Sequence, residues 1–163
     1  MKTIELTQGK AALVDDCDYV YLSQWKWCYS TKGYAVRTIP TPEKNRRQGV
    51  EYMHRVILAL PDELEVDHVE HSKLNNQRAN LRGVTHRENI FNQTPRKNTT
   101  SKHKGVSWDT AQHKWVTQIQ FNKKKRALGV FDNVNEAVEA YNTAAIKLFG
   151  EFACLNEIEY ENA

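Results

Sequence analysis

The stretch TPRKNTTSKHK at positions 94–104 limits most strongly how this chain can fold, because it has no large apolar residue to bury. Its Thr, Asn, Lys and Pro residues are typical of a connecting segment. Patterns of apolar residues resume on both sides of it. We therefore interpret it as a linker between two units, 1–93 and 105–163. The linker is also cationic, which suits a segment that runs along a phosphate backbone.

Charge is distributed very unevenly along the chain. Residues 94–131 hold nine Lys or Arg and one Asp, whereas residues 132–163 hold seven acidic residues and one Lys. A basic block beside an acidic one favours a surface that binds a polyanion, backed by an element that faces away from the ligand.

Other classes of protein are disfavoured by the sequence. No apolar run is long enough for a membrane helix, and the first residues lack the apolar core of a signal peptide. We therefore expect a soluble intracellular protein, and nothing implies a membrane or a protein partner. Cys17, Cys28 and Cys154 are odd in number, far apart and without CxxC spacing. Buried thiols are thus expected rather than disulfides or a cysteine zinc site.

The second unit has the clearer pattern. Residues 105–109, 114–121 and 125–131 form strand-like runs, separated by polar turns at 109–113 and 122–123. A helix is predicted to begin at the cap Asn133 and to end at Gly150. These elements predict a three-stranded antiparallel sheet covered by one helix. Alanines let the helix lie close to the sheet, and the basic residues are left for the other face.

The first unit begins with short alternating runs at 2–6, 10–14, 26–30 and 34–38, and a loop is predicted at 38–49. A short helix at 53–60 is expected to end before Pro61. A strand ending at 66–68, a polar loop at 69–80, a strand at 81–84 and a helix through Gln93 follow. The predicted fold class is α+β.

Polar residues converge in this last part of the first unit. Asp67 and His68 end a strand, and Asn89 lies about one turn into the helix, from which it can point back at them. Asp67 and Asn89 offer two oxygen atoms to a hard divalent cation, and His68 stands beside them as a base near neutral pH. Asn80, at the end of the loop, can bond backbone groups and hold the loop closed.

The pattern Asp67-His68, Asn80-Leu81 and Arg87-Glu88-Asn89 resembles the HNH nuclease family in its His-Asn-Asn form. The preceding MHRVILALPDELEVDH is similar to the lead-in of homing members from phages and introns. The resemblance implies a ββα-metal fold with His68 and Asn80 as catalytic residues and Asp67 and Asn89 as ligands of Mg²⁺ or Mn²⁺. His68 would activate water, Asn80 would order the loop, and the protein would act in a phage-infected or bacterial host cell.

A zinc site of His68, His71 and His86 is disfavoured, because no cysteine or carboxylate completes it. His54 is expected to be structural rather than a base. The arginines near the polar loop, Arg78, Arg82 and Arg87, either contact phosphates or have no specific role. The N-terminal part offers a weak signal for further DNA contacts, through Lys32, Arg37, Arg46 and Arg47.

The second unit is similar to the APETALA/ethylene-response-factor DNA-binding domain in KGV, KWV-x-QI, LGVFD, EAVEAYNTAAIKLFG and A-x-LN. The resemblance implies a sheet laid into the major groove of double-stranded DNA, with the helix behind it. Gln118 and Gln120 would pair with adenine and the run 123–126 would contact phosphate, although a solvated hairpin is the alternative. Trp115 is expected to pack under the sheet, whereas Trp108 is left open. The full set of expected DNA-binding residues is Lys102, Lys104, Gly105, Ser107, Gln118, Gln120, Lys123, Lys124, Lys125 and Arg126.

Taken together, the sequence predicts a metal-dependent endonuclease of the homing type, with a nuclease unit tethered to a unit that reads DNA. One alternative is a sequence-specific transcription regulator whose nuclease-like unit is inactive. Another is a nuclease or binder of structured RNA.

Overall fold

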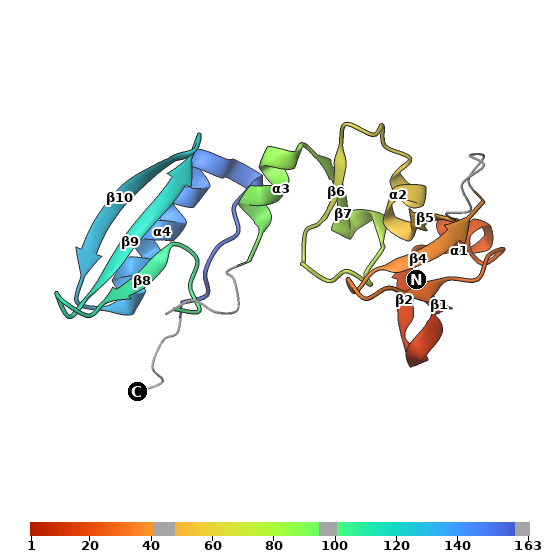
Figure 1. The fold of residues 1–163 in the computed structure, drawn as a ribbon, viewed down its shortest axis with the longest axis horizontal. Coiled ribbons are helices and arrows are strands. Elements are labelled where there is room, and N and C mark those ends of the chain that lie inside the picture. Colours follow the sequence, from red (N-terminus) through yellow and green to blue (C-terminus); the bar gives the residue numbers. More distant parts are fainter. Residues whose placement is uncertain (41–47, 95–100, 159–163) are drawn as a thin grey trace. The chain divides into compact units, whose positions relative to one another are not determined.

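The chain divides into two compact units, Met1–His86 and Arg87–Ala163. The computed structural model describes residues 1–40, 48–94 and 101–158 (Figure 1). The sequence suggested a boundary after Gln93, but the helix before it contacts the second unit. Its Phe91 stacks on Phe149 with ring centroids 4.1 Å apart. Residues 95–100 of the predicted linker lie outside the described residues, and the assignment of cutting and reading to the two units stays a prediction.

Short antiparallel strands make up the sheets of the first unit. The orders are β1-β2, β3-β4-β5 and β6-β7. The bounds are β1 (Lys2–Glu5), β2 (Ala11–Val14), β3 (Cys28–Tyr29), β4 (Ala35–Ile39), β5 (Gly49–Tyr52), β6 (Glu65–His68) and β7 (Leu81–Val84). The predicted strands around the loop 69–80 are thus present as β6 and β7, whereas β5 was not predicted.

Helix α2 (Met53–Leu58) confirms the predicted short helix, and α3 (His86–Asn92) confirms the helix after β7. Helix α1 (Asp16–Leu22) was not predicted. Two acidic residues in its first turn favour a helix start, but Leu22 is its only buried residue, so it lacks an apolar repeat. Among the described residues, no helix has the length and apolar character that crossing a membrane requires.

The core of the first unit lies beneath the ribbon formed by β6 and β7. Met53 and Ile57 of α2 are buried in the same cluster as Leu81 of β7 and Leu22 of α1. The indole Nε1 of Trp27 donates a hydrogen bond to the carbonyl oxygen of Leu22 at 2.8 Å, which satisfies a buried donor. The ribbon is therefore supported on a packed base from both ends of the unit's sequence.

The second unit has the predicted architecture. Its sheet has the order β10-β9-β8, from β8 (Val106–Asp109), β9 (Lys114–Phe121) and β10 (Lys124–Phe131), and α4 (Val134–Phe149) packs on one face of it (Figure 1). The Asn133 side chain caps α4 by accepting from the N–H of Asn135 at 2.7 Å. Buried Ala137 lies so close to the sheet that its carbonyl oxygen accepts from Thr117 Oγ1 at 3.1 Å.

The prediction of buried thiols is wrong for two of the three cysteines. Cys17 and Cys28 are exposed and only Cys154 is buried. Cys17 lies in the first turn of α1, where its Sγ is 3.7 Å from Asp18 Oδ2, and Cys28 lies on the short strand β3 at the edge of its sheet. All three are free thiols.

Gly105 was expected among the DNA-binding residues, but its position has a packing explanation. Its φ is +73°, and a Cβ built there would lie 2.3 Å from the ring of Tyr141 and 2.5 Å from the carbonyl oxygen of Gln118. A side chain is therefore excluded by both backbone conformation and space.

We predict that Gly105→Ala destabilises the second unit by about 3 kcal/mol or more, because conformational strain and overpacking add. Gly150→Ala is the matched control, since Gly150 also has a positive φ but nothing within 4 Å of a built Cβ. It should cost roughly 1–2 kcal/mol. Urea unfolding of both variants measures the difference, and equal losses would contradict the steric explanation.

Candidate active site

The loop 69–80 between β6 and β7 is closed by the buried side chain of Asn80. Its Oδ1 accepts from the backbone N–H of Glu70 at 2.8 Å, and its Nδ2 donates to the carbonyl oxygen of Asn75 at 2.8 Å. A backbone bond from Val69 to the Asn80 carbonyl oxygen, at 2.9 Å, continues the ribbon into the loop. The hydrogen bonds that the sequence predicted for Asn80 are thus present, and they fix the chain that follows His68.

His68 lies at the end of β6 with only 6% of its surface exposed. Its ring packs against those of His54 and Tyr34, with centroids 5.2 Å and 5.9 Å away. Its Nε2 lies 3.4 Å from Oδ1 of Asn76, a residue that is 1% exposed. Because an amide oxygen only accepts, this contact favours the tautomer with the proton on Nε2.

Among the described residues, the ring of His68 makes its one hydrogen-bond contact through Nε2, with Asn76. The contact leaves the other ring nitrogen, Nδ1, to accept a proton, which is the role of a general base.

Burial lowers the pKa of His68, and this effect outweighs the others. The contact with Asn76 and the charge of Asp67 raise the pKa, and the nearby ammonium of Lys73 lowers it. The side chain is thus neutral at pH 7 and can accept a proton.

Asp67 is paired with Arg82, directly across the ribbon from it. Nε and Nη2 of Arg82 lie 2.9 Å and 2.8 Å from the same carboxylate oxygen, Oδ2. The sequence left open whether Arg82 contacts phosphate; its guanidinium instead holds the carboxylate in place. A cation bound by Asp67 would share this carboxylate with Arg82.

The predicted cation ligands, Asp67 and Asn89, both offer oxygen atoms, which suit Mg²⁺ or Mn²⁺. Within the described ranges, no three His, Cys, Asp or Glu side chains gather closely enough to hold a metal ion. The predicted donor set differs in kind from such a cluster, because one of its two ligands is an amide. The chemistry of the two side chains fits a hard cation that also takes phosphate oxygens and water.

Asn89 lies in α3. The first residue of this helix, His86, bonds through Nδ1 to Glu65 Oε1 at 2.7 Å, whereas residues further along contact the second unit. The guanidinium of Arg87 bonds to Oδ1 of Asn122 and lies 4.9 Å from the ring centroid of Phe121. The ammonium of Lys104 donates to the carbonyl oxygens of Phe91 and Gln93, both at 2.6 Å. Asp67 and Asn89 therefore belong to different compact units. Their convergence on one cation stays a prediction.

Two further arginines of the first unit also have internal partners. Arg78 bonds to Asp18 at 2.7 Å and 2.9 Å, and Arg37 pairs with Glu51 across β4 and β5. Residues 41–47, which include Arg46 and Arg47, lie outside the described residues. These two arginines thus have partners within the fold, and nothing in the sequence pattern predicted such long-range pairs.

His54 is structural, as expected. It is 9% exposed and packs against Tyr34, Tyr52 and His68 with ring centroids 5.2–5.3 Å away. Burial, and to a lesser extent the charges of His68 and Arg55, lower its pKa to about 3. The residue therefore stays neutral while it supports the neighbouring imidazole. The sequence missed Asn76 and Tyr34 as neighbours of His68, because neither lies near it in a recognisable pattern.

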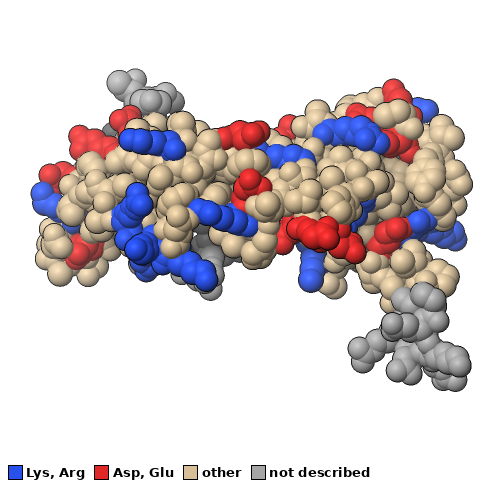
Figure 2. Space-filling model, turned by 90° about the horizontal axis from the view of Figure 1, so that it is seen from above, with Lys and Arg blue, Asp and Glu red and all other residues tan. Residues whose placement is uncertain are grey.

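In the second unit, strand alternation separates the expected DNA-binding residues. Residues 115, 117, 119 and 121 of β9 face α4, since Ile119 and Thr117 are buried against it. Gln118 and Gln120 are exposed on the opposite, outer face. Lys125 is paired with Gln120, and Ser107 with Val116, so both also lie on the outer face. In Figure 2, Lys and Arg side chains cluster on the left-hand unit, which carries this sheet.

The basic run 123–126 is split by the same alternation. Lys124 pairs with Phe121, and Arg126 pairs with Ile119, so both lie on the side of the sheet that α4 covers. Lys104 is also engaged, because its half-buried ammonium bonds to the end of α3 and burial lowers its pKa. Trp115 packs into the core as expected, and its register partner Trp108 lies on the same side.

Residues of the candidate site lie in a stretch that matches a known protein family. A family model described as HNH endonuclease matches residues 51–90, from β5 to part of α3. A protein of Acanthamoeba polyphaga mimivirus, described as an uncharacterized HNH endonuclease, is 30% identical over 155 residues. That alignment covers 94% of this chain and 78% of the relative, and so it extends through both units. No solved structure matches the chain significantly.

The low pKa of His54 predicts a pH-dependent stability. The folded protein has a pKa of about 3 at this position, against 6.5 for an ordinary histidine, so the unfolded chain binds a proton first as the pH falls. The contribution of His54 to the free energy of unfolding should be fully present above pH 6.5. It should decrease towards pH 3, by up to about 1.4 kcal/mol per pH unit. His54→Phe removes this dependence.

Urea unfolding at pH 7.5 and at pH 5 measures the effect. The stability difference between wild type and His54→Phe should shrink or reverse at the lower pH. His113→Asn, a change in an exposed turn of the second unit, is the control and should show the same difference at both values. A pH-independent difference for His54→Phe would contradict the assignment of a buried neutral ring.

Proposed function

The chain belongs to the HNH endonuclease family, and from this premise we propose that it hydrolyses phosphodiester bonds of double-stranded DNA. The observation that carries the proposal is the imidazole of His68, which follows Asp67 in β6, is packed in place and contacts Asn76 through Nε2, so that Nδ1 is left to accept a proton. An endonuclease is a hydrolase, so the reaction needs a base, a site for the scissile phosphate and charge stabilisation.

His68 acts as the general base in this proposal. Nδ1 takes a proton from a water molecule while that water attacks phosphorus and the 3′-oxygen leaves. The lowered pKa of His68 keeps the ring ready to accept the proton at neutral pH. The contact of Nε2 with Asn76 keeps the ring in the tautomer that leaves Nδ1 available.

Asn80 acts by closing the loop after His68, so that the imidazole does not swing away from its packed position. Asp67 and Asn89 would hold one divalent cation, Mg²⁺ or Mn²⁺. When bound, the cation supplies charge stabilisation for the pentacovalent phosphate and for the leaving oxygen. Arg82 holds the Asp67 carboxylate in place for this role.

The second unit would read the DNA sequence, as its resemblance to the APETALA/ethylene-response-factor domain implies. Support comes from the outer face of its sheet, where Gln118, Gln120 and Lys125 are exposed on the side away from α4. Glutamine side chains can pair with adenine in the major groove, and a lysine beside them can contact phosphate. Lys104 and Gly105 are left out of this surface, because their contacts are internal.

We assign the enzyme to the homing type because a nuclease unit joined to a DNA-reading unit suits cleavage at a DNA sequence that occurs rarely. A base and one cation act on any phosphodiester bond, so sequence specificity must come from another part of the chain. The viral relative aligns through both units, which supports the view that the two units work together in one protein. The substrate would then be genomic DNA of a phage or of its bacterial host.

We predict that wild type nicks or linearises supercoiled plasmid in the presence of Mg²⁺ or Mn²⁺, and that His68→Ala lowers the rate by about a thousandfold. His113→Asn is the matched control, since it removes an exposed histidine and retains a residue that tolerates the positive φ there. Plasmid left equally intact by wild type and His68→Ala across several metals would favour the inactive-regulator alternative. Preferential cleavage of structured RNA would favour the RNA alternative.

If the outer face of the sheet contacts DNA, substitutions of two neighbouring lysines should differ in their effect on DNA binding. Lys125→Ala should weaken duplex binding and reduce the slope of log affinity against log salt by about 0.9, because one phosphate contact is lost. Lys124→Ala, on the covered side of the sheet, should change the slope much less. Gln120→Ala should alter the preferred sequence at one position, by about 1–3 kcal/mol. A larger effect of Lys124→Ala than of Lys125→Ala would contradict the proposed face.

A further inference from the structure

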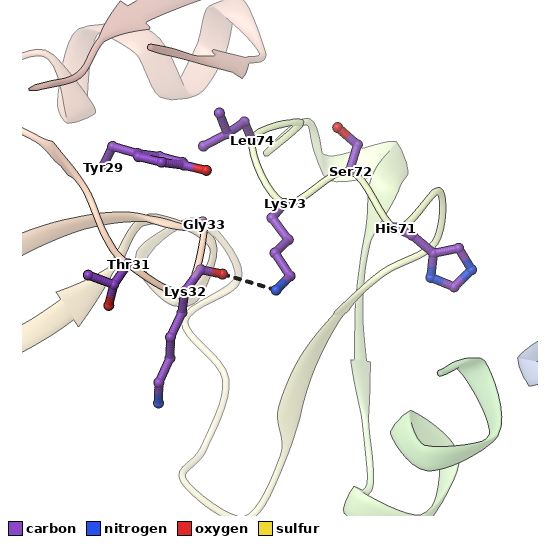
Figure 3. Close-up of a pocket in the computed structure, with 8 residues that line it drawn as sticks. All are labelled: Tyr29, Thr31, Lys32, Gly33, His71, Ser72, Lys73 and Leu74. Atoms are coloured by element: carbon purple, nitrogen blue, oxygen red, sulfur yellow. Dashed lines mark hydrogen bonds between the residues drawn. The ribbon is translucent and has the colours of Figure 1, made fainter. Parts of the chain in front are cut away.

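A hollow of about 460 Å³ opens on the first unit between the turn before β4 and the loop that Asn80 closes. It is lined by residues 29, 31–33 and 71–74 (Figure 3). The lining residues include Lys32, Lys73, Thr31 and Ser72, but no Asp or Glu. Such a set of hydrogen-bond donors without a carboxylate suits an anion.

Lys73 is held in place within this hollow. Its Nζ donates to the carbonyl oxygen of Lys32 at 3.0 Å, as Figure 3 shows, and lies 4.6 Å from the centroid of the Tyr34 ring. One hydrogen bond leaves two further N–H groups of the ammonium for a ligand. Gly33 also lines the hollow, and its φ of +86° favours glycine at this turn.

The hollow adjoins the proposed base. The ring of Tyr34 links them, because its centroid lies 4.6 Å from the ammonium of Lys73 and 5.9 Å from the ring centroid of His68. Lys73 belongs to the same loop 69–80 that begins directly after His68. A nucleic-acid strand that brings one phosphate to His68 therefore has neighbouring phosphates within reach of the hollow.

The charge balance of the first unit leaves its lysines, and not its arginines, available to a polyanion. Within its described residues, each arginine pairs with a carboxylate, as in Arg37–Glu51, Arg55–Asp62, Arg78–Asp18 and Arg82–Asp67. No ion pair involves Lys32 or Lys73 among the same residues, and the same holds for Lys26. What distinguishes Lys32 and Lys73 is that both line one hollow.

We propose that the hollow is a second phosphate subsite of the enzyme, which binds a backbone phosphate next to the scissile one through Lys73 and Lys32. This inference rests on the proposed cleavage of DNA. The subsite is independent of base sequence, because a phosphate contact positions the duplex and carries no sequence information. It anchors the DNA strand at the nuclease unit, so that the scissile phosphate stays at His68 while the second unit recognises the DNA sequence.

The test uses the full chain and a duplex that wild type cleaves. Lys73→Ala and Lys32→Ala should each raise KM on the order of fivefold, leave kcat nearly unchanged, and reduce the salt slope of duplex binding by about 0.9. The effect should be the same for duplexes of different sequence. Lys73→Arg should restore most of the affinity, since it keeps the charge and the donors.

Lys26→Ala is the matched control, because Lys26 is an exposed lysine of the same unit that does not line the hollow. Lys32→Ala guards against a folding artefact at Lys73, since only the backbone carbonyl of Lys32 takes part in the contact with Lys73. If Lys73→Ala and Lys32→Ala show the KM and salt slope of Lys26→Ala, the subsite is wrong even though cleavage stands. If wild type cleaves DNA with none of the metals tested, the proposed function is wrong. The salt dependence of duplex binding by the lysine variants then still tests whether the hollow binds a phosphate.

Discussion

The site depends on the hydrogen bonds with which Asn80 closes the loop 69–80. Two strands of four residues are too short to order a twelve-residue loop by themselves. The strand before the loop ends at His68, the proposed base. The amide of Asn80 bonds backbone groups at both sides of the loop, so it replaces ladder bonds that the strands cannot supply. Its side chain is 3% exposed, and loss of these bonds would leave buried polar groups unsatisfied. Asp67, His68 and the hollow beyond them therefore share one structural support.

Much of the fold could be predicted because its signals are local. The strands of the second unit alternate, its helix has an asparagine cap and a terminal glycine, and α2 ends before a proline. Helix α1 was missed because it buries one residue and has no apolar repeat. Within the candidate site, Asp67, His68, Asn80 and Asn89 could be named from spacing alone. The neighbours that set their properties could not, since Tyr34, Asn76 and Arg82 reach the site only through tertiary packing.

Residue type alone also misleads about which basic residues meet a ligand. Lys104 belongs to a basic block and to a family motif, yet its ammonium caps the end of α3 and is half-buried. Lys124 and Lys125 are neighbours in sequence, but a strand alternates its side chains, so only Lys125 shares a face with Gln120. Composition measures how much positive charge the chain carries. The register of the strands and the hydrogen bonds of each ammonium decide how much of that charge is available.

Available charge is distributed differently in the two units, and this difference has a physical consequence. In the first unit the described arginines are neutralised by carboxylates, whereas the run 123–126 of the second unit makes no ion pair among the described residues. Salt-dependent attraction to a polyanion grows with the number of uncompensated cations. A cutting site with strong attraction of its own would engage any duplex, and its chemistry cannot tell one phosphodiester from another. In the proposed mechanism, weak charge at the nuclease unit and stronger charge at the second unit would thus keep a sequence-blind reaction under the control of the surface proposed to contact the bases.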